Sequence, residues 1–213
     1  MKRELEKLQK DYRHRILSMK DLPEDPISLF KIWMDEALNE DVPEPNAMSV
    51  STVSNKRKPS SRTVLLKEFN SEGLVFYTNY NSRKAKEISE NPYVSALIFW
   101  PELERQVRIE GHAAKISGKE SDEYFASRPR ASQIGAWASP QSEEIESRKE
   151  LEKRFSDTEK KYEGKEIPRP FHWGGYRIVP SSFEFWQGSI ARLNDRIVYC
   201  NEKGSWLMKR LAP

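Results

Sequence analysis

The apolar positions of this chain follow two different periods. After Asp25 they recur at the spacing of one helix face, and the side chains of this stripe are Phe30, Trp33, Met34, Ala37 and Leu38. Asp25 can cap a helix, and the proline that follows it suits a first helical turn. The pattern therefore predicts an amphipathic helix that packs on a sheet.

Short runs of β-type residues, separated by turn residues, follow this helix. We expect strands over Met48–Val53, Ser61–Phe69, Leu74–Asn79, Tyr93–Trp100 and Glu104–Ile116, with one brief helix over Ser82–Glu90. Residues 119–163 are highly charged and helical in pattern. Strand-type stretches return at Trp173–Val179, Phe183–Gln187, Arg196–Cys200 and Trp206–Leu211. Short connections favour antiparallel neighbours, so the pattern predicts a closed antiparallel barrel of the α+β class.

Length and the N-terminal pattern suggest how the chain is organised. At 213 residues it can bury one substantial core, so we expect a single domain over residues 21–213. Residues 2–17 are charged, with Leu5, Leu8 and Tyr12 at roughly helical spacing. We interpret residues 1–20 as a loosely attached, mobile helix that could act as a lid.

The charge balance excludes a strongly basic polyanion binder. The chain has 36 Lys and Arg against 33 Asp and Glu, a net charge of +3. Its single cysteine, Cys200, lies in an alternating run typical of strand packing and fits a reducing compartment. No apolar run is long enough to span a membrane, and the charged N-terminus lacks a signal-peptide core. We therefore expect a cytoplasmic protein without a nucleic-acid or membrane partner.

Several kinds of site have little support in the sequence. His14, His112 and His172 are far apart and have no acidic or cysteine neighbours at ligand spacing, so no metal site is expected. The chain has no glycine-rich dinucleotide or Walker motif, and no serine lies on a nucleophile elbow. Any phosphate must therefore be held by side chains.

The segment from Asn81 to Glu87 places two cations, Arg83 and Lys84, in the first turn of the expected helix. The helix dipole disfavours cations there by a few tenths to about 1 kcal/mol. Together with free backbone N–H groups, these cations could bind an anion. Side chains that extend into solvent are an equally good interpretation.

Two more cations, Arg62 and Lys67, lie five residues apart, so in a regular strand they point to opposite faces. A flat ligand along the strand edge could contact both, although two solvated strand ends explain them as well. In the strand from Glu104 the even positions are polar, so Gln106 faces either a ligand or water.

A third candidate cluster lies at Tyr124, Arg128 and Ser132, which are spaced by four residues. If a helix ends near Arg128 and another begins after Pro129, a phenol, a guanidinium and a hydroxyl could converge on one phosphate.

Near the C-terminus, Trp186 is followed by Arg192 and Arg196, which suits a planar anionic ligand. An ion pair between Arg196 and Asp195 on a hairpin is an equally economical interpretation.

Ten segments in order resemble the pyridoxamine 5′-phosphate oxidase family, from about Asp25 to Pro213. They are RTVLLK, FYTN with SRKAKEI, NPYVSALIFW, ERQVRIEG, YFASRPRASQIGAW, QS, WGGYRIVP, FEFWQG, RLNDR and RLAP. Each motif is weak alone, but their shared order is specific. The resemblance implies an FMN-binding split β-barrel with flanking helices and a homodimer with FMN at the subunit interface.

The resemblance also implies ligand contacts. The FMN contacts would be Arg62, Thr63, Val64, Leu65, Leu66, Lys67, Tyr77, Thr78, Arg83, Lys84, Gln106, Gln141, Ser142, Trp186 and Arg196. The substrate phosphate would be bound by Lys67, Tyr124, Arg128 and Ser132. Arg192 and Asn194 would contact the substrate at its reacting end.

The implied reaction is the oxidation of pyridoxine or pyridoxamine 5′-phosphate to pyridoxal 5′-phosphate, with O2 as electron acceptor and H2O2 as product. No side chain can accept a hydride, so the flavin must do so. The protein's part is placement, and Arg192 would act by electrostatic positioning because a guanidinium stays protonated.

One position departs from the family pattern. The family usually reads Arg-Leu-His-Asp-Arg, whereas this chain has Asn194 in place of the histidine. Asparagine keeps a donor and an acceptor but cannot titrate near neutral pH. Either the residue mainly orients substrate, or this protein is slower or uses another ligand.

Two alternatives stay open from the sequence. One is a split-barrel flavoprotein with another substrate, and the other is a non-catalytic protein that binds pyridoxal phosphate or single-stranded nucleic acid.

Overall fold

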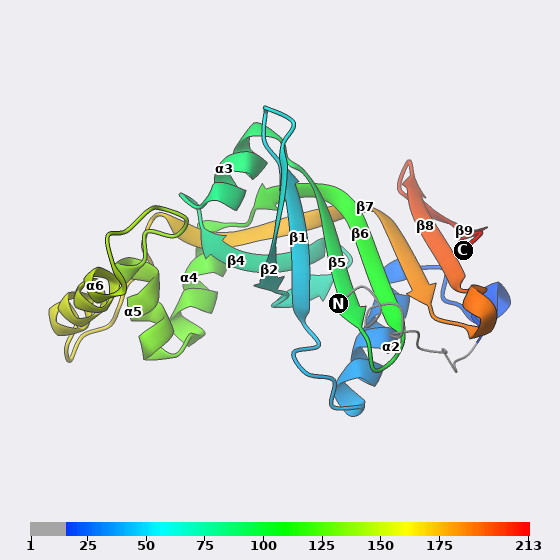
Figure 1. Cartoon of the computed structure of the whole chain (residues 1–213), viewed down its shortest axis with the longest axis horizontal. Helices are drawn as coiled ribbons and strands as arrows, with labels where there is room; N and C mark the ends of the chain where they lie inside the picture. Colours follow the sequence, from blue (N-terminus) through cyan, green and yellow to red (C-terminus); the bar gives the residue numbers. More distant parts are fainter. Residues whose placement is uncertain (1–15) are drawn as a thin grey trace, which may run out of the picture. The chain divides into compact units, whose positions relative to one another are not determined.

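The computed structural model describes residues 16–213, shown with their element labels in Figure 1. Most of the segment interpreted as a lid lies outside the described residues. The helical elements are η1 (Met19–Asp21), α2 (Pro26–Asn39), α3 (Arg83–Glu90), α4 (Gly118–Ser127), α5 (Arg130–Ala138), α6 (Arg148–Lys161) and η2 (Ile190–Arg192). The strands are β1 (Ala47–Val53), β2 (Pro59–Leu65), β3 (Glu68–Asn70), β4 (Gly73–Asn79), β5 (Tyr93–Trp100), β6 (Arg105–Lys115), β7 (Trp173–Gln187), β8 (Asp195–Glu202) and β9 (Ser205–Leu211).

Helix α2 forms where the apolar stripe predicts it. The Asp25 side chain accepts a hydrogen bond from the Ser28 backbone N–H at 2.8 Å, which satisfies one free donor of the first turn. The prediction that the whole apolar stripe is buried is wrong at one position, because Leu38 is 57% exposed. The buried face includes Leu29 instead, which shifts its centre and leaves Leu38 at its edge.

The strands confirm the α+β class, and their pairing order is β2-β1-β5-β6-β7-β4-β3, with β8 on β7 and β9 on β8. The pairs β3–β4, β4–β7, β7–β8 and β8–β9 are antiparallel. Among the described strands β2 and β3 stand at the two ends of this order. The hydrogen-bonded order is therefore open. This confirms the split barrel that the resemblance implies, whereas the closed barrel expected from the strand pattern alone is wrong.

Two strand boundaries differ from the sequence pattern. The expected strand over Ser61–Phe69 is two strands, separated at Leu66 and Lys67. Conversely, β7 is continuous through Pro180. Its partner changes there, because it pairs with β4 up to Ile178 and with β8 from Ser182. Pro180 therefore lies where the absence of a backbone donor costs no hydrogen bond to either strand.

The described chain divides into two compact units. The first unit contains the residues up to Ser49, Ser95–Glu110 and Pro180–Pro213, and the second contains Val50–Val94 and Gly111–Val179. Strands β1, β5, β6 and β7 each contribute residues to both units, and the expectation of one domain over residues 21–213 stays a prediction.

Each unit has its own aromatic core. In the first unit, Trp33 of α2 meets Phe185 edge to face, with 5.1 Å between ring centroids. In the second unit, Phe125, Ile134, Ile167 and Trp173 form the core, and α5 packs beside α6 (Figure 1). No helix within residues 16–213 is both long enough and apolar enough to cross a membrane.

Candidate functional site

A cavity of about 270 Å³ in the second unit brings together most of the ligand contacts that the sequence suggests for that unit. It is lined by Thr63, Val64, Leu65, Lys67, Tyr77, Thr78, Lys84, Tyr124, Arg128, Gln141 and Trp173. These residues come from β2, β4, α3, α4 and β7 and from the loops that follow β2, α4 and α5. The cations Arg62 and Arg83 are not among the lining residues, and Leu66 is buried in the core.

An adjoining cavity of about 260 Å³ shares Arg128, Gln141 and Trp173 with the first cavity and adds Ser132. Helix α4 ends at Ser127 and α5 begins at Arg130, as the proline predicts. Arg128 therefore lies in the break between two helices and lines both cavities. Tyr124 lines the first cavity and Ser132 the adjoining one, and their convergence with Arg128 on one phosphate stays a prediction.

The Arg128 guanidinium lies over the Trp173 ring, 4.5 Å from its centroid. Its Nη1 atom is buried and has no hydrogen-bond partner in the described chain. Burial lowers the pKa of Arg128, and the Tyr124 hydroxyl partly opposes this effect. A buried donor without a partner costs about 1–3 kcal/mol, and an anionic acceptor would remove that cost.

Lys84 is buried beside the first cavity, and its hydrogen bonds all go to neutral acceptors. Its Nζ donates to Thr78 Oγ1 at 2.9 Å, to Gln141 Oε1 at 3.0 Å and to Ser82 Oγ at 3.4 Å. Burial, with a smaller contribution from the charge of Arg62, lowers the pKa of Lys84 to about 8. The ammonium is thus charged at neutral pH, and none of its described partners carries a negative charge.

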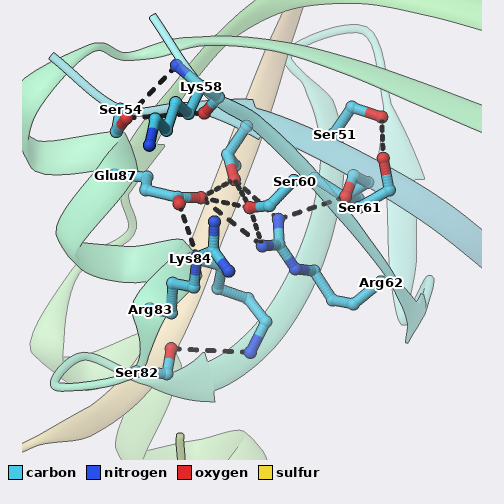
Figure 2. Close-up of polar contacts among 12 residues, drawn as sticks. Ser51, Ser54, Lys58, Ser60, Ser61, Arg62, Ser82, Arg83, Lys84 and Glu87 are labelled. Atoms are coloured by element: carbon cyan, nitrogen blue, oxygen red, sulfur yellow. Dashed lines mark hydrogen bonds and ion pairs between the residues drawn. The ribbon is translucent and has the colours of Figure 1, made fainter. Parts of the chain in front are cut away.

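The buried carboxylate of Glu87 forms ion pairs with two neighbouring cations, Arg62 and Arg83 (Figure 2). It accepts hydrogen bonds from Ser60 at 2.6 Å, from Thr52, and from Arg83 Nε at 2.8 Å, and Arg62 Nη2 lies 3.4 Å away. Burial would raise its pKa, but the hydrogen bonds from Ser60, Thr52 and Arg83 outweigh burial and lower the pKa to about 2. Glu87 is therefore charged at any physiological pH.

Stacked aromatic rings form one wall of the first cavity. Tyr77 and Tyr124 stack with 3.8 Å between centroids, and Tyr77 and Trp173 stack at 5.4 Å. A side chain at Gly175 would come within 2.4 Å of Ile116 and 3.0 Å of Tyr77, so the glycine lets the strand approach this wall. Burial raises the pKa of Tyr77 to about 12, so its phenol stays neutral.

In the first unit, Arg196 is bound by a carboxylate. Its Nε donates to Glu184 Oε1 at 2.9 Å and its Nη2 to Glu184 Oε2 at 3.1 Å, and this hydrogen bonding raises its pKa. Arg108 contacts the same carboxylate at 2.8 Å. The alternative pair between Arg196 and Asp195 is wrong, because neighbouring strand residues point to opposite faces. Asp195 instead binds Arg210.

The remaining expected contacts of the first unit differ in exposure. Arg192 is exposed and has a positive φ of 61°, whereas Asn194 is half-buried and its Oδ1 accepts from the Ser189 N–H at 3.0 Å. Trp186 and Gln106 are half-buried. The sequence pattern predicts that the even-numbered polar residues from Glu104 onward face a ligand or water. This prediction is wrong at its first position, because Glu104 is only 4% exposed.

Ser142, in the second unit, is exposed with a φ of 72°. Within residues 16–213 no group of three histidine, cysteine, aspartate or glutamate side chains could hold a metal ion. The sequence reasoning missed three residues of the second unit that the structure places at the site, namely Thr52, Glu87 and Trp173. The dense serine and threonine content before Arg62 and the motif WGG are the only sequence signals that point to them.

Comparisons with known proteins show the family of this chain. The family model described as pyridoxamine 5′-phosphate oxidase matches residues 34–162, and the model of the pyridoxine 5′-phosphate oxidase C-terminal dimerisation region matches residues 173–213. A pyridoxine/pyridoxamine 5′-phosphate oxidase of Rubrobacter xylanophilus is 51% identical over 100% of this chain and 98% of its own. That of Haemophilus influenzae is 50% identical over 99% of this chain and 100% of its own.

Two solved structures share the fold. PhzG from Burkholderia lata, in complex with tetrahydrophenazine-1-carboxylic acid, has a TM-score of 0.90 and 30% identity, with 96% of this chain and 100% of that chain covered. An FMN-binding protein from Nostoc punctiforme has a TM-score of 0.69 and 17% identity over 92% of this chain and 100% of that chain, which shows the fold alone. The matches span nearly the whole sequence, and the chain belongs to the pyridoxamine 5′-phosphate oxidase family.

Proposed function

We propose that this chain oxidises pyridoxine or pyridoxamine 5′-phosphate to pyridoxal 5′-phosphate, with FMN as cofactor and O2 as electron acceptor, and that it works as a homodimer. The relatives that are about half identical over the whole chain carry this activity in their names. The observation in the structure that supports it best is the buried, unpartnered Nη1 of Arg128 beside a cavity lined by Lys67 and Tyr124.

The second unit offers a donor set that fits FMN. A phosphate monoester carries a charge of about −1.5 to −2 at neutral pH and accepts strong hydrogen bonds. Lys84 supplies a buried ammonium whose described partners are neutral. Arg83 precedes it in the chain, and the charge of Arg62 contributes to its lowered pKa. The backbone after Arg62 lines the same cavity through Thr63, Val64 and Leu65, which suits a flat ring along the strand edge. We therefore assign FMN to these residues, together with Tyr77, Thr78 and Gln141.

When it is bound, FMN supplies the acceptor for the hydride that leaves the substrate carbon. The substrate phosphate would be held by Lys67, Tyr124, Arg128 and Ser132. Two cations and two hydroxyls match a doubly charged phosphate, and the Arg128 Nη1 donor gains the acceptor that it lacks within the described chain. Holding the phosphate fixes the direction of the pyridine ring and turns a two-body encounter into a positioned one.

At the reacting end of the substrate we assign Arg192 and Asn194. Arg192 stays protonated, so its role is to orient the substrate electrostatically rather than to remove a proton. Asn194 has its oxygen occupied by the Ser189 N–H, which leaves its amide N–H₂ group to donate to a substrate hydroxyl or amine. The contacts assigned to Gln106, Trp186 and Arg196 complete the proposed cofactor set, together with Leu66 and Ser142.

Flavin uptake and anaerobic reduction test this function. Purified protein incubated with FMN should become yellow after removal of free flavin, and pyridoxine 5′-phosphate should bleach it without oxygen. Air should restore the colour and release H2O2 and pyridoxal 5′-phosphate. A protein that takes up no FMN would indicate a flavin-free binding protein. Bleaching by tetrahydrophenazine-1-carboxylic acid alone would indicate a flavoenzyme with another substrate.

The homodimer has its own measurement. The dimerisation-region model covers residues 173–213, which include β8 and β9. Light scattering coupled to size exclusion should give twice the mass of the 24.9 kDa chain. A monomeric mass for the FMN-loaded protein would contradict the proposal.

A further inference from the structure

We propose that Glu87 is a positioning residue that holds Arg62 and Arg83 as a fixed cationic subsite for the phosphate of the flavin cofactor. The inference rests on the proposed function, since it takes FMN as the ligand. Glu87 itself would not touch the cofactor, and it would act through the two guanidinium groups that it binds.

Glu87 connects three segments of the chain, α3, β1 and β2, by hydrogen bonds. Its carboxylate is on α3 and only 5% of the residue is exposed, yet it reaches Thr52 on β1 and Ser60 on β2 as well as Arg83 one turn away. Each hydroxyl donates to Glu87 and accepts from Arg62. The Arg62 Nη1 donates to Thr52 Oγ1 at 2.6 Å. The Arg62 Nη2 donates to Ser60 Oγ at 2.5 Å (Figure 2). The carboxylate thus fixes Arg62 mainly through two hydroxyl bridges and Arg83 directly.

This arrangement occupies both terminal nitrogens of Arg62 and the Nε of Arg83, and it leaves positive charge in excess. Arg62, Arg83 and Lys84 carry three positive charges, and Glu87 is the one carboxylate that the described contacts give them, so two positive charges stay uncompensated. That excess equals the charge of a phosphate monoester dianion. A neutral side chain in place of Glu87 would leave three cations that repel one another. A second carboxylate would cancel their attraction for phosphate.

The electrostatics indicate that these cations share one region. The charge of Arg62 contributes to the lowered pKa of Lys84, and the charge of Arg83 contributes to that of Arg62. The side chain of Arg83 is 61% exposed and has one ion pair among the described residues, with Glu87. Without that carboxylate the guanidinium would be free to turn into solvent, away from Arg62. Preorganisation is what Glu87 adds, because binding FMN then requires no ordering of that long side chain.

The test compares FMN with riboflavin, which lacks the phosphate, by quenching of flavin fluorescence. In Glu87→Gln we expect the dissociation constant for FMN to rise roughly tenfold to a hundredfold, the range for loss of one or two hydrogen bonds to charged groups. Affinity for riboflavin should stay within about twofold, because the isoalloxazine contacts do not involve Glu87. Glu87→Asp, which keeps the charge, should recover part of the FMN affinity.

Two further measurements separate positioning from folding. Glu90→Gln is the matched control, since Glu90 is on the same helix, is exposed and accepts a hydrogen bond from the Asn55 N–H. It should leave both affinities unchanged. If Glu87→Gln does not fold, Ser60→Ala removes one hydroxyl bridge and should still weaken FMN severalfold more than riboflavin. In a double-mutant cycle with Arg83→Gln, the two losses of FMN affinity should be less than additive.

The outcomes distinguish this inference from the proposed function. Equal or tighter FMN binding by Glu87→Gln, with wild type binding FMN normally, would overturn the positioning role and leave the oxidase proposal intact. Equal losses for FMN and riboflavin would also overturn it, since they would indicate a general structural effect. Failure of the wild-type chain to bind FMN would instead remove the proposed function.

Discussion

Two pairs of cationic side chains, Lys84 and Arg128 in the second unit and Arg196 and Arg108 in the first, have opposite kinds of partner. In the second unit, Lys84 donates only to neutral oxygens and Arg128 has a buried Nη1 without a partner, and burial lowers the pKa of both. In the first unit, Arg196 binds both oxygens of Glu184, which raises its pKa, and Arg108 binds the same carboxylate. The two sets share residue types but not partners.

The difference indicates what each set does. A cation whose partners are neutral pays a desolvation cost in the free protein, and an anionic ligand removes that cost on binding. Arg196 already binds both oxygens of Glu184, so it contributes to the folded state and gains less from a further anion. We therefore expect substitutions in the second unit to weaken ligand binding most, and substitutions at Glu184 to weaken the fold most.

Arg128 gives the largest expected effect. In Arg128→Ala the KM for pyridoxine 5′-phosphate should rise about a hundredfold, because a charge-assisted contact to phosphate contributes about 1.5–3 kcal/mol. FMN occupancy should be unchanged. Arg130→Ala is the matched control, since its guanidinium is exposed and binds the carbonyl oxygens of Lys165 and Tyr162. An unchanged KM in steady-state assays would show that Arg128 does not bind the substrate phosphate.

Glu184 tests the other side of the comparison. In Glu184→Gln the free energy of unfolding of the cofactor-free protein should fall by about 2 kcal/mol, because the charge-assisted bonds to Arg196 and Arg108 are lost. Urea denaturation measures this change. Glu110→Gln serves as control, because Glu110 is exposed and lies 3.5 Å from the same Arg108. If the free energy of unfolding were unchanged while FMN affinity collapsed, Glu184 would serve ligand binding instead of folding, and the contrast between the units would fail.

Lys84 adds a pH dependence. Its pKa is about 8 in the free protein, and a phosphate favours the charged form, so FMN affinity should fall as pH rises through about 8. Affinity should also fall below about pH 6, where the phosphate takes up its second proton. In Lys84→Met we expect FMN affinity about tenfold lower at pH 7 and no alkaline decrease near pH 8. Fluorescence titrations between pH 6 and 9.5 measure both.

Lys86→Met is the control for Lys84, because Lys86 is exposed and two residues away on the same helix. It should keep both the affinity and the alkaline decrease. An alkaline decrease that persists in Lys84→Met would assign the titration to another group.

The sequence predicts those parts of the fold that depend on local rules. Asp25, Pro26 and the apolar stripe locate α2, and Pro129 locates the break between α4 and α5 where Arg128 lies. These signals are local because a cap or a proline acts on its own turn. The continuity of β7 through Pro180 could not be predicted in this way, since it depends on which strand is the partner at each position.

The candidate site was predictable mostly by resemblance and only partly by chemistry. Spacing identifies Tyr124, Arg128 and Ser132, but it cannot tell that Lys84 is buried while Arg83 is exposed. It also gives no sign that Glu87 binds Thr52, 35 residues away, because that contact is set by how β1 and α3 pack. The burial of an ionisable group and the identity of its partner are tertiary properties, and these decide which cations are available to a ligand.

The smallest expected effect concerns Asn194, which stands where the sequence resemblance leads us to expect a histidine. Asn194→His should preserve or raise turnover, with any change below about fivefold, the ratio that one neutral hydrogen bond of about 1 kcal/mol represents. A neutral imidazole can accept from the Ser189 N–H as the asparagine oxygen does at 3.0 Å. Protonated imidazole cannot, so the variant should acquire an acid limb in kcat/KM near the ordinary histidine pKa of about 6.5. Asn201→His, at an exposed position near the end of β8, should show no such limb. A loss of turnover beyond about tenfold would exceed one hydrogen bond and indicate that the pocket is built around asparagine.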